Sequence, residues 1–195
     1  MFAALLDTSV LWPSLQRDFL LSMAVEGLYR PLWSEAVLEE LHEHEQLKLL
    51  DRGAEQADAE TAADHLVNQM RSAFSDAIVS GWEGLEGSFG LPDPDDEHVL
   101  AAAVVGGAGV VVTDNLKHFP KAKLPAHMAV STGRRFAEDT ADVSPESTVR
   151  ALQAISRRHR KTAHSARDLV DLMVVRYDMQ ALPDILHDAL NEAGL

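Results

Sequence analysis

The sequence predicts an α/β domain built on an open parallel β-sheet with helices on both faces, followed by a C-terminal α-helical extension. Residues 2–6 and 109–113 are short, continuous apolar runs, which are typical of buried parallel strands. Between them, apolar side chains recur at the spacing of amphipathic helices, and from Ser144 onward only helical patterns occur. Strands that alternate with helices indicate a parallel sheet. We therefore assign residues 1–137 to the α/β domain and residues 138–195 to the helical extension.

The composition is that of a globular protein without reactive sulfur. The chain has 195 residues, enough for one domain and an appendage, and it contains no cysteine. Disulfides, thiolate zinc sites, iron–sulfur clusters and a cysteine nucleophile are therefore excluded. The apolar run at the N-terminus is too short for a secretory signal, and no stretch reaches the roughly 20 apolar residues of a membrane span. We expect a soluble, cytoplasmic protein.

The first half of the chain alternates between predicted strands and helices. Continuous apolar runs predict strands, whereas apolar side chains three or four residues apart, such as Leu15, Phe19 and Met23, predict a helix. Ser34 is a residue type favoured as a helix N-cap, so we expect a helix to begin there. In chain order the predicted elements are strand 2–6, helix 12–28, strand 29–33, helix 34–50, helix 54–74 and strand 77–79.

Glycine and proline mark the element boundaries in the second half. Four glycines between residues 81 and 92 predict a loop. Asp93 as N-cap and Pro94 at the first helical position predict a helix start, and Gly106-Gly107 predicts its end. The predicted elements are helix 93–105, strand 109–113, strand 128–131 and helices 145–160, 165–175 and 180–191.

Acidic residues lie where the predicted strands end. Asp7 directly follows the first strand, and Asp114 follows the strand over residues 109–113. Asp96 lies in the first turn of the helix before that strand, and Glu40 lies on the helix that begins near Ser34. Ligand sites of open parallel sheets lie beyond the carboxyl ends of the strands. We therefore expect these four carboxylates to converge at one edge of the sheet.

A convergence of carboxylates has a chemical consequence. Neighbouring carboxylates repel one another and raise each other's pKa unless a cation neutralises them. The hard divalent ions Mg²⁺ and Mn²⁺ suit a pocket of oxygen ligands. Such an ion activates water near neutral pH and stabilises the charge that develops in phosphoryl displacement. The sequence therefore predicts a Mg²⁺ or Mn²⁺ site suited to that chemistry.

Each acid also has a purely structural interpretation. Asp7 alone is equally consistent with a helix cap, and either Glu39 or Glu40 could face solvent on their acid-rich helix. Three acids near the helix start at residue 93 are assigned to capping and to the helix dipole: Asp93, Asp95 and Glu97. The combination of acids at strand ends is more specific than any single member.

Charge is distributed unevenly along the chain. The 17 Lys and Arg residues and 31 Asp and Glu residues give a net charge of -14. Ten basic and four acidic residues between Lys117 and Lys161 give that segment +6, and 7 basic and 27 acidic residues leave -20 for the rest. Clustered cations could hold a polyanion beside the acidic pocket. The densest cluster, residues 157–161, is also consistent with a solvated helical surface.

The remaining motifs favour no second activity. Asp7-Thr8-Ser9 lacks the second aspartate of haloacid-dehalogenase phosphatases, and Ser9 has no local histidine that would suggest a hydrolase triad. The three tryptophans are scattered, and we expect them in the core rather than stacked on nucleic-acid bases: Trp12, Trp33 and Trp82.

Four strings of residues together resemble one family, in its order and with its spacing, over residues 2 to about 135. They are Leu5-Leu-Asp7-Thr-Ser9-Val-Leu, Trp33-Ser-Glu-Ala-Val-Leu-Glu-Glu40-Leu, Leu91-Pro-Asp-Pro-Asp-Asp96-Glu-His-Val-Leu-Ala-Ala-Ala and Val112-Thr-Asp114-Asn115-Leu-Lys-His-Phe-Pro. The chain resembles the PIN-domain nucleases, and especially the bacterial branch related to VapC toxins. The resemblance implies a PIN-like parallel sheet with helices on both faces.

The resemblance also implies roles for particular residues. The metal-binding and catalytic acids of the family fall on Asp7, Glu40 and Asp96, while Ser9 takes the place of a small polar residue that assists. The family pattern puts the fourth position on Asn115, with Asp114 one residue earlier as the alternative. We assign the four acids as metal ligands, and Ser9 and Asn115 to the positioning of water or phosphate.

The activity that the resemblance implies is that of a Mg²⁺- or Mn²⁺-dependent endoribonuclease, which leaves a 5′-phosphate and a 3′-hydroxyl. It also implies the toxin of a toxin–antitoxin pair, a small antitoxin protein that blocks the site, and homodimers. Two alternatives stay open. The chain could be a catalytically weak interaction module with the same fold, or its substrate could be DNA, including flap structures.

Overall fold

The computed structural model describes residues 2–158 and 164–195, and these residues form two compact units. The first, here called the sheet unit, comprises Phe2–Trp12 and Pro31–Val130. The second, here called the helical unit, comprises Pro13–Arg30 and Ser131–Leu195. The predicted fold class, a parallel sheet with helices and a C-terminal set of helices, is confirmed. The division into residues 1–137 and 138–195 stays a prediction.

The sheet has five strands, and its order places β1 in the centre. The strands are β1 (Ala3–Leu6), β2 (Arg30–Ser34), β3 (Ile78–Val79), β4 (Val110–Val112) and β5 (Ala129–Ser131), in the order β3-β2-β1-β4-β5. β1 pairs in parallel with β4, with Leu6 opposite Val112, and β2 pairs in parallel with β3. The chain crosses from β1 to β2 on one side and later adds β4 on the other. The carboxyl ends of β1 and β4 therefore form the switch point at which such sheets bind ligands.

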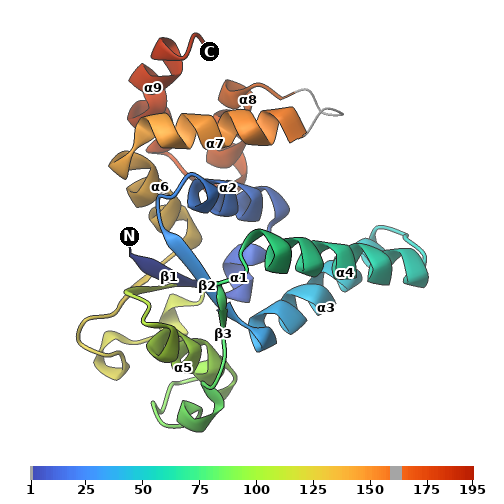
Figure 1. Ribbon diagram of the computed structural model, residues 1–195, viewed down its shortest axis with the longest axis vertical. Coiled ribbons are helices and arrows are strands. Elements are labelled where there is room, and N and C mark those ends of the chain that lie inside the picture. Colours follow the sequence, from blue (N-terminus) through green and yellow to red (C-terminus); the bar gives the residue numbers. More distant parts are fainter. Residues whose placement is uncertain (1, 159–163) are drawn as a thin grey trace. The chain divides into compact units, whose positions relative to one another are not determined.

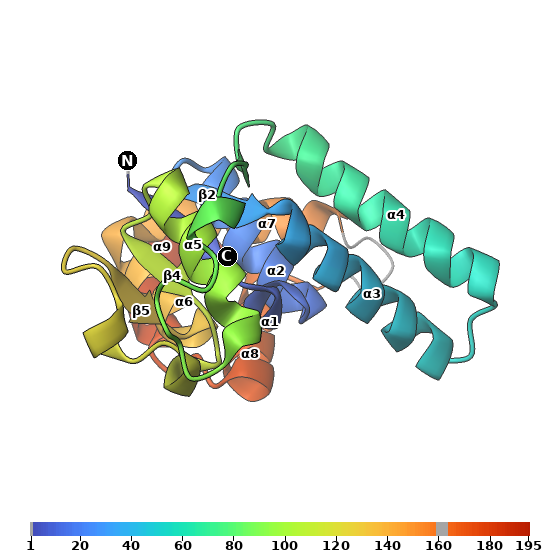
Figure 2. The same cartoon turned by 90° about the horizontal axis from the view of Figure 1, so that it is seen from below.

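The helices of the sheet unit begin and end at residues suited to those positions. They are α1 (Thr8–Leu11), α3 (Glu35–Asp51), α4 (Gln56–Ala73) and α5 (Glu97–Gly106). The Ser34 hydroxyl accepts a hydrogen bond from the backbone N–H of Val37, as expected of an N-cap. Gly107, in the left-handed conformation, ends α5. Figures 1 and 2 both show α3 and α4 side by side in a hairpin that extends away from the sheet.

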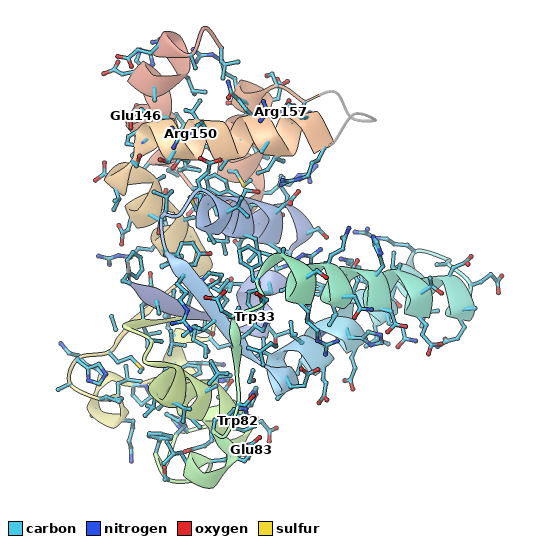
Figure 3. The ribbon with its side chains drawn as sticks, in the orientation of Figure 1. Trp33, Trp82, Glu83, Glu146, Arg150 and Arg157 are labelled. Atoms are coloured by element: carbon cyan, nitrogen blue, oxygen red, sulfur yellow. The ribbon has the colours of Figure 1, made fainter. Side chains whose placement is uncertain are left out.

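Short 3₁₀ turns occur in the connections between these elements. They are η1 (Glu83–Leu85), η2 (Pro94–Asp96), η3 (Leu116–His118) and η4 (Lys121–Lys123). Among the tryptophans, Trp33 is fully buried, as predicted, and packs edge-on against Phe74 (Figure 3). Trp12, in contrast, is 43% exposed, so the prediction of a core position is wrong for this residue.

The helical unit packs five helices around its own core. They are α2 (Ser14–Val25), α6 (Gly133–Val143), α7 (Pro145–Arg158), α8 (Ala166–Tyr177) and α9 (Leu182–Glu192). Tyr29 packs edge-on against Phe136. Figure 3 shows Arg150 and Arg157 along α7, and Arg150 forms an ion pair with Glu26. Arg158 forms an ion pair with Asp18, and residues 159–161 of the predicted basic cluster lie outside the described residues.

A substitution at Gly106 tests the packing of α5 on the sheet. Alanine is normally favoured over glycine in a helix by roughly 0.5–1 kcal/mol. A Cβ at position 106, however, would lie 2.8 Å from Val79 Cγ2 and 2.9 Å from Leu32 Cδ1. Because overpacking of a core costs about 1–3 kcal/mol, we expect Gly106→Ala to lower the free energy of unfolding in urea by that amount.

The matched control is Gly84→Ala, since a Cβ at that glycine would meet no atom within 4 Å. This variant should stay within about 0.5 kcal/mol of the wild type. A Gly106→Ala protein at least as stable as the wild type would contradict the close approach of α5 to β2 and β3.

Candidate functional site

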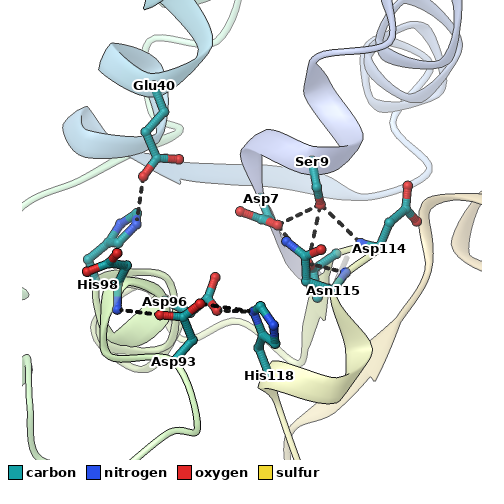
Figure 4. A network of polar contacts seen from close by, with 11 residues as sticks. Asp7, Ser9, Glu40, Asp93, Asp96, His98, Asp114, Asn115 and His118 are labelled. Carbon is teal, nitrogen blue, oxygen red and sulfur yellow. Dashed lines mark hydrogen bonds and ion pairs between the residues drawn. The ribbon is translucent and has the colours of Figure 1, made fainter. Parts of the chain in front are cut away.

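Asp7 is fixed at the carboxyl end of β1 by the neighbouring strand. Its backbone N–H donates to the carbonyl of Val112 in β4 at 3.0 Å, and its side chain is only 4% exposed. The hydroxyls of Ser9 and Thr113 both donate to Asp7 Oδ2 at 2.6 Å (Figure 4). Asp7 occupies the N-cap position of α1, yet its side chain makes no capping hydrogen bond. The carboxylate is therefore held in place by the site and does not cap the helix.

Glu40, on α3, contacts the first residue of α1, which directly follows Asp7. Thr8 Oγ1 donates to Glu40 Oε2 at 2.5 Å. His98 Nε2 lies 3.0 Å from Glu40 Oε1, a contact that Figure 4 shows. Burial raises the pKa of Glu40, but the hydrogen bonds from His98 and Thr8 outweigh it, and the pKa lies below its usual value. Burial likewise lowers the pKa of His98, but the contact with Glu40 raises it overall. The two side chains form an ion pair in which His98 is buried and the Glu40 side chain is 42% exposed, whereas Glu39 is exposed.

Asp96 comes from the turn between η2 and α5. Its Oδ2 lies 2.6 Å from His118 Nδ1, and the same nitrogen lies 3.6 Å from Asp93 Oδ2. Burial raises the pKa of Asp96, the contact with His118 lowers it, and the negative charges of Asp7 and Asp93 raise it again, so the pKa lies above its usual value. The repulsion between Asp7 and Asp96 shows that two predicted acids, 89 positions apart in the sequence, share one electrostatic environment.

The tightest set of potential metal ligands among the described residues includes one predicted residue and two that were missed. One ligand atom each from Asp93, Asp96 and His118 lies within 4.8 Å of the others. Asp93 does cap the η2 turn, because its Oδ1 accepts from the backbone N–H of Asp95, but its Oδ2 faces His118. The one feature of the sequence that could have indicated His118 as a ligand is its position three residues after Asn115, at the end of the short η3 turn. Two carboxylates and an imidazole fit a divalent ion such as Mn²⁺, so the residues present suit the predicted metal.

The residues after β4 contribute backbone contacts to the site. The N–H of Asp114 donates to Ser9 Oγ at 3.0 Å, and the N–H of Asn115 donates to Thr113 Oγ1 at 3.1 Å. Figure 4 shows the carboxylate of Asp114 pointing away from Asp7. Which of Asp114 and Asn115 fills the fourth position stays a prediction. Thr113, which the sequence did not single out, is fully buried and joins Asp7, Ser9 and Asn115 in one network.

Glu97 holds the glycine-rich loop in place, in addition to its predicted position in the first turn of α5. Its side chain is 2% exposed and accepts hydrogen bonds from the backbone N–H groups of Leu91 at 2.7 Å and Phe89 at 3.1 Å. Burial raises the pKa of Glu97, but these donors outweigh it, and the pKa lies below its usual value. Glu97 therefore anchors the glycine-rich loop that leads to Asp93. Glu97 does lie in the first turn of α5, as predicted, but the sequence did not indicate that it also accepts from the N–H groups of the preceding loop.

A parallel sheet with acidic side chains at the carboxyl ends of its central strands defines a class of α/β domains that bind ligands at this edge. Residues 3–117, more than half of the chain, match the family model described as PIN domain, and the chain therefore belongs to the PIN-domain family. PIN domains are generally metal-dependent nucleases, which supports a hydrolase. Comparisons with curated proteins and with solved structures give no match. Among the described helices, none has both the length and the apolar character required to cross a membrane.

A substitution at Glu97 tests the anchoring of the loop. Glu97→Gln keeps the side-chain shape but removes the charge and replaces one acceptor oxygen with a donor. Because leaving a buried hydrogen-bonding group unpaired costs about 1–3 kcal/mol, we expect a loss of that size in urea unfolding at neutral pH. The exposed neighbour Asp95 gives the control, since Asp95→Asn should leave the stability unchanged within about 0.5 kcal/mol.

The same variant should change the pH dependence of stability. The pKa of Glu97 is lower in the folded chain than in the unfolded chain, whose usual value is 4.5. The stabilisation is therefore complete above that value and declines as the pH falls through the folded-state pKa. Wild-type protein should thus lose more stability than Glu97→Gln on acidification, as followed by urea unfolding at several pH values. Equal losses in the two proteins would contradict the assignment.

Proposed function

We propose that this PIN domain is a divalent-metal-dependent endoribonuclease that hydrolyses phosphodiester bonds. The observation that carries the proposal is the approach of Asp7, Glu40 and Asp96 to one another from three separate elements at the carboxyl edge of the sheet. The negative charge of Asp7 raises the pKa of Asp96, and the charges of Glu40 and Asp7 raise the pKa of His98. A divalent cation would relieve this repulsion, which is the condition under which crowded carboxylates are stable.

The proposal gives each side chain a role. The four predicted acids, Asp7, Glu40, Asp96 and Asp114, hold Mg²⁺ or Mn²⁺, and a bound ion of this type activates water and stabilises phosphoryl charge. Thr8 and His98 keep Glu40 ionised and oriented, and His118 does the same for Asp96. Ser9 and Asn115 position water or phosphate. Whether Asp114→Asn or Asn115→Ala weakens Mn²⁺ binding decides which residue fills the fourth position.

RNA as the substrate draws support from exposed cations in the sheet unit. Three lysines lie on the η3 and η4 turns, in the segment that also carries His118: Lys117, Lys121 and Lys123. All three are exposed, so their ammonium groups are accessible to phosphates. DNA or flap substrates are the alternative, and defined RNA and DNA oligonucleotides in one cleavage assay separate the two.

The cellular role is proposed from the likeness of the four motif strings to VapC-type proteins. We propose the toxin of a type II toxin–antitoxin pair in the bacterial cytoplasm, with a small antitoxin protein as partner and a homodimer as the active assembly. Co-expression with the product of a neighbouring small gene tests the partnership, and sedimentation analysis tests the dimer.

A second candidate, a catalytically weak interaction module, is favoured by one specific observation. Two imidazoles already lie against two of the acids, His98 on Glu40 and His118 on Asp96, and contact these carboxylates without an ion. In such a module the histidines would replace the metal. The two candidates therefore differ in whether the acids bind a divalent ion at all.

Substitution of Asp96 tests the catalytic proposal. We expect Asp96→Asn to abolish Mn²⁺-dependent cleavage of RNA, because it removes a charged ligand. The melting temperature without metal should stay near that of the wild type or rise, since the burial and neighbouring acids that raise the pKa of Asp96 also disfavour its charge. Asp95→Asn removes an exposed charge one position away and should retain cleavage. Retained cleavage by Asp96→Asn would reject this site.

Calorimetric titration with Mn²⁺ separates the nuclease from the interaction module. The proposal predicts saturable binding to wild-type protein that is lost in Asp96→Asn. His118→Ala should weaken binding about 10- to 100-fold, the usual effect of removing a group that supports or completes a metal site. No saturable binding up to about 1 mM Mn²⁺, a concentration well above the affinity of a working metal site, would favour the interaction module.

A further inference from the structure

An exposed tryptophan lies at the end of the helix that carries part of the candidate site. Trp12 is 43% exposed, although the two residues before it, Val10 and Leu11, are completely buried. Tryptophan is usually among the more buried residues, so an exposed indole beside a site calls for a functional explanation. Trp33, in contrast, is completely buried.

The position of Trp12 is fixed by two contacts. Its backbone N–H donates to the carbonyl of Thr8 at 2.9 Å, which completes the single turn of α1. Its ring lies against the imidazole of His44 on α3, with ring centroids 6.1 Å apart and planes at 56°. The indole is thus partly oriented by the imidazole before any ligand binds, and such orientation reduces the entropy lost when a ligand stacks on it.

The same two helices connect Trp12 to the acidic site. Thr8, one turn before Trp12 on α1, donates to Glu40. His44, one turn after Glu40 on α3, acts on the Glu40 carboxylate electrostatically and helps to lower its pKa. The Trp12–His44 pair therefore lies about one helical turn from the Thr8–Glu40 contact, at the edge of the site.

We propose that Trp12, supported by His44, is the platform on which an unpaired base of single-stranded RNA stacks beside the scissile phosphate. This inference rests on the proposed nuclease function and specifies its substrate as a strand with exposed bases. Bases in a duplex are stacked on one another and offer no face to a protein ring, whereas unpaired bases stack on aromatic side chains.

The charges around Trp12 favour a base over a phosphate as its ligand. Residues 35–73, which form α3, α4 and their connection, contain 10 acidic and 3 basic residues and so carry a net charge of -7. A phosphate would be repelled by this hairpin, but a base is neutral and binds through dispersion and π-stacking. The exposed lysines of η3 and η4 are then the groups that contact the phosphates.

The test measures binding in the absence of cleavage. Full-length protein in EDTA is titrated into a single-stranded RNA that contains 2-aminopurine, whose fluorescence is quenched on stacking. Since stacking on an aromatic ring is worth a factor of about 5 to 100 in affinity per base, we expect Trp12→Ala and Trp12→Leu to weaken binding by that factor and to remove the quench. Trp12→Phe keeps an aromatic face and should retain most of both.

Three controls separate stacking from other effects. Val105→Ala changes a residue that is also 43% exposed but lies at the far end of α5 from Asp96, and it should bind RNA like the wild type. The slope of affinity against salt concentration should be unchanged in all Trp12 variants, because no charge is altered. On an RNA with an abasic nucleotide at the quenched position, Trp12→Ala should cause no further loss.

The outcomes distinguish this inference from the proposed function. Asp96-dependent cleavage together with wild-type RNA affinity in Trp12→Ala would overturn the stacking role and leave the nuclease, with the exposed indole then assigned to a protein partner. A Trp12-dependent quench without any metal-dependent cleavage would leave the stacking role and overturn the nuclease. Equal affinities of Trp12→Leu and Trp12→Phe would show a simple apolar contact and reject stacking.

Discussion

The mutual repulsion of buried carboxylates is the constraint around which the sheet unit is built. The negative charge of Asp7 raises the pKa of Asp96, and the charges of Glu40 and Asp7 both raise the pKa of His98. A fold can tolerate such crowding only if it supplies hydrogen-bond donors and positive charge. The hydroxyls of Thr8, Ser9 and Thr113 supply donors. His98, whose pKa is raised, supplies positive charge beside Glu40, and the imidazole of His118 lies against Asp96.

The hydroxyl network also explains why the site lies at β1 and β4. Parallel pairing of these strands brings Asp7 beside Thr113, although 106 positions separate them, and the two side chains bond directly. The same network continues to the backbone of Asp114 through Ser9. The strand ends are therefore joined by side chains as well as by the β-ladder, and the geometry of the acids follows from the register of the sheet. A slip of one residue would turn Asp7 to the opposite face.

The sequence predicted the elements with strong apolar patterns and missed those with weak ones. All five strands and the helices that flank them follow from apolar runs and helical spacing. α1 was missed because a four-residue helix has no period of its own, and α6 was missed although Thr132 caps it by accepting from Arg135 N–H. In the site, acids at strand ends could be predicted because their place follows from topology. The partners His98 and His118 could not, because no pattern along the chain specifies which side chains meet across it.

The two histidine contacts differ in how they leave room for an ion. At Glu40 the two oxygens receive different donors, His98 on Oε1 and Thr8 on Oε2, and each oxygen keeps a further lone pair. A metal can therefore bind Glu40 while both donors stay in place. At Asp96, His118 Nδ1 lies 2.6 Å from Oδ2 and 3.6 Å from Asp93 Oδ2. If these three residues held a divalent ion, His118 would ligate it as a neutral imidazole instead of making its hydrogen bond with Asp96. Glu40 could thus bind an ion with its present contacts intact, whereas the residues around Asp96 would have to exchange a hydrogen bond for a ligand bond.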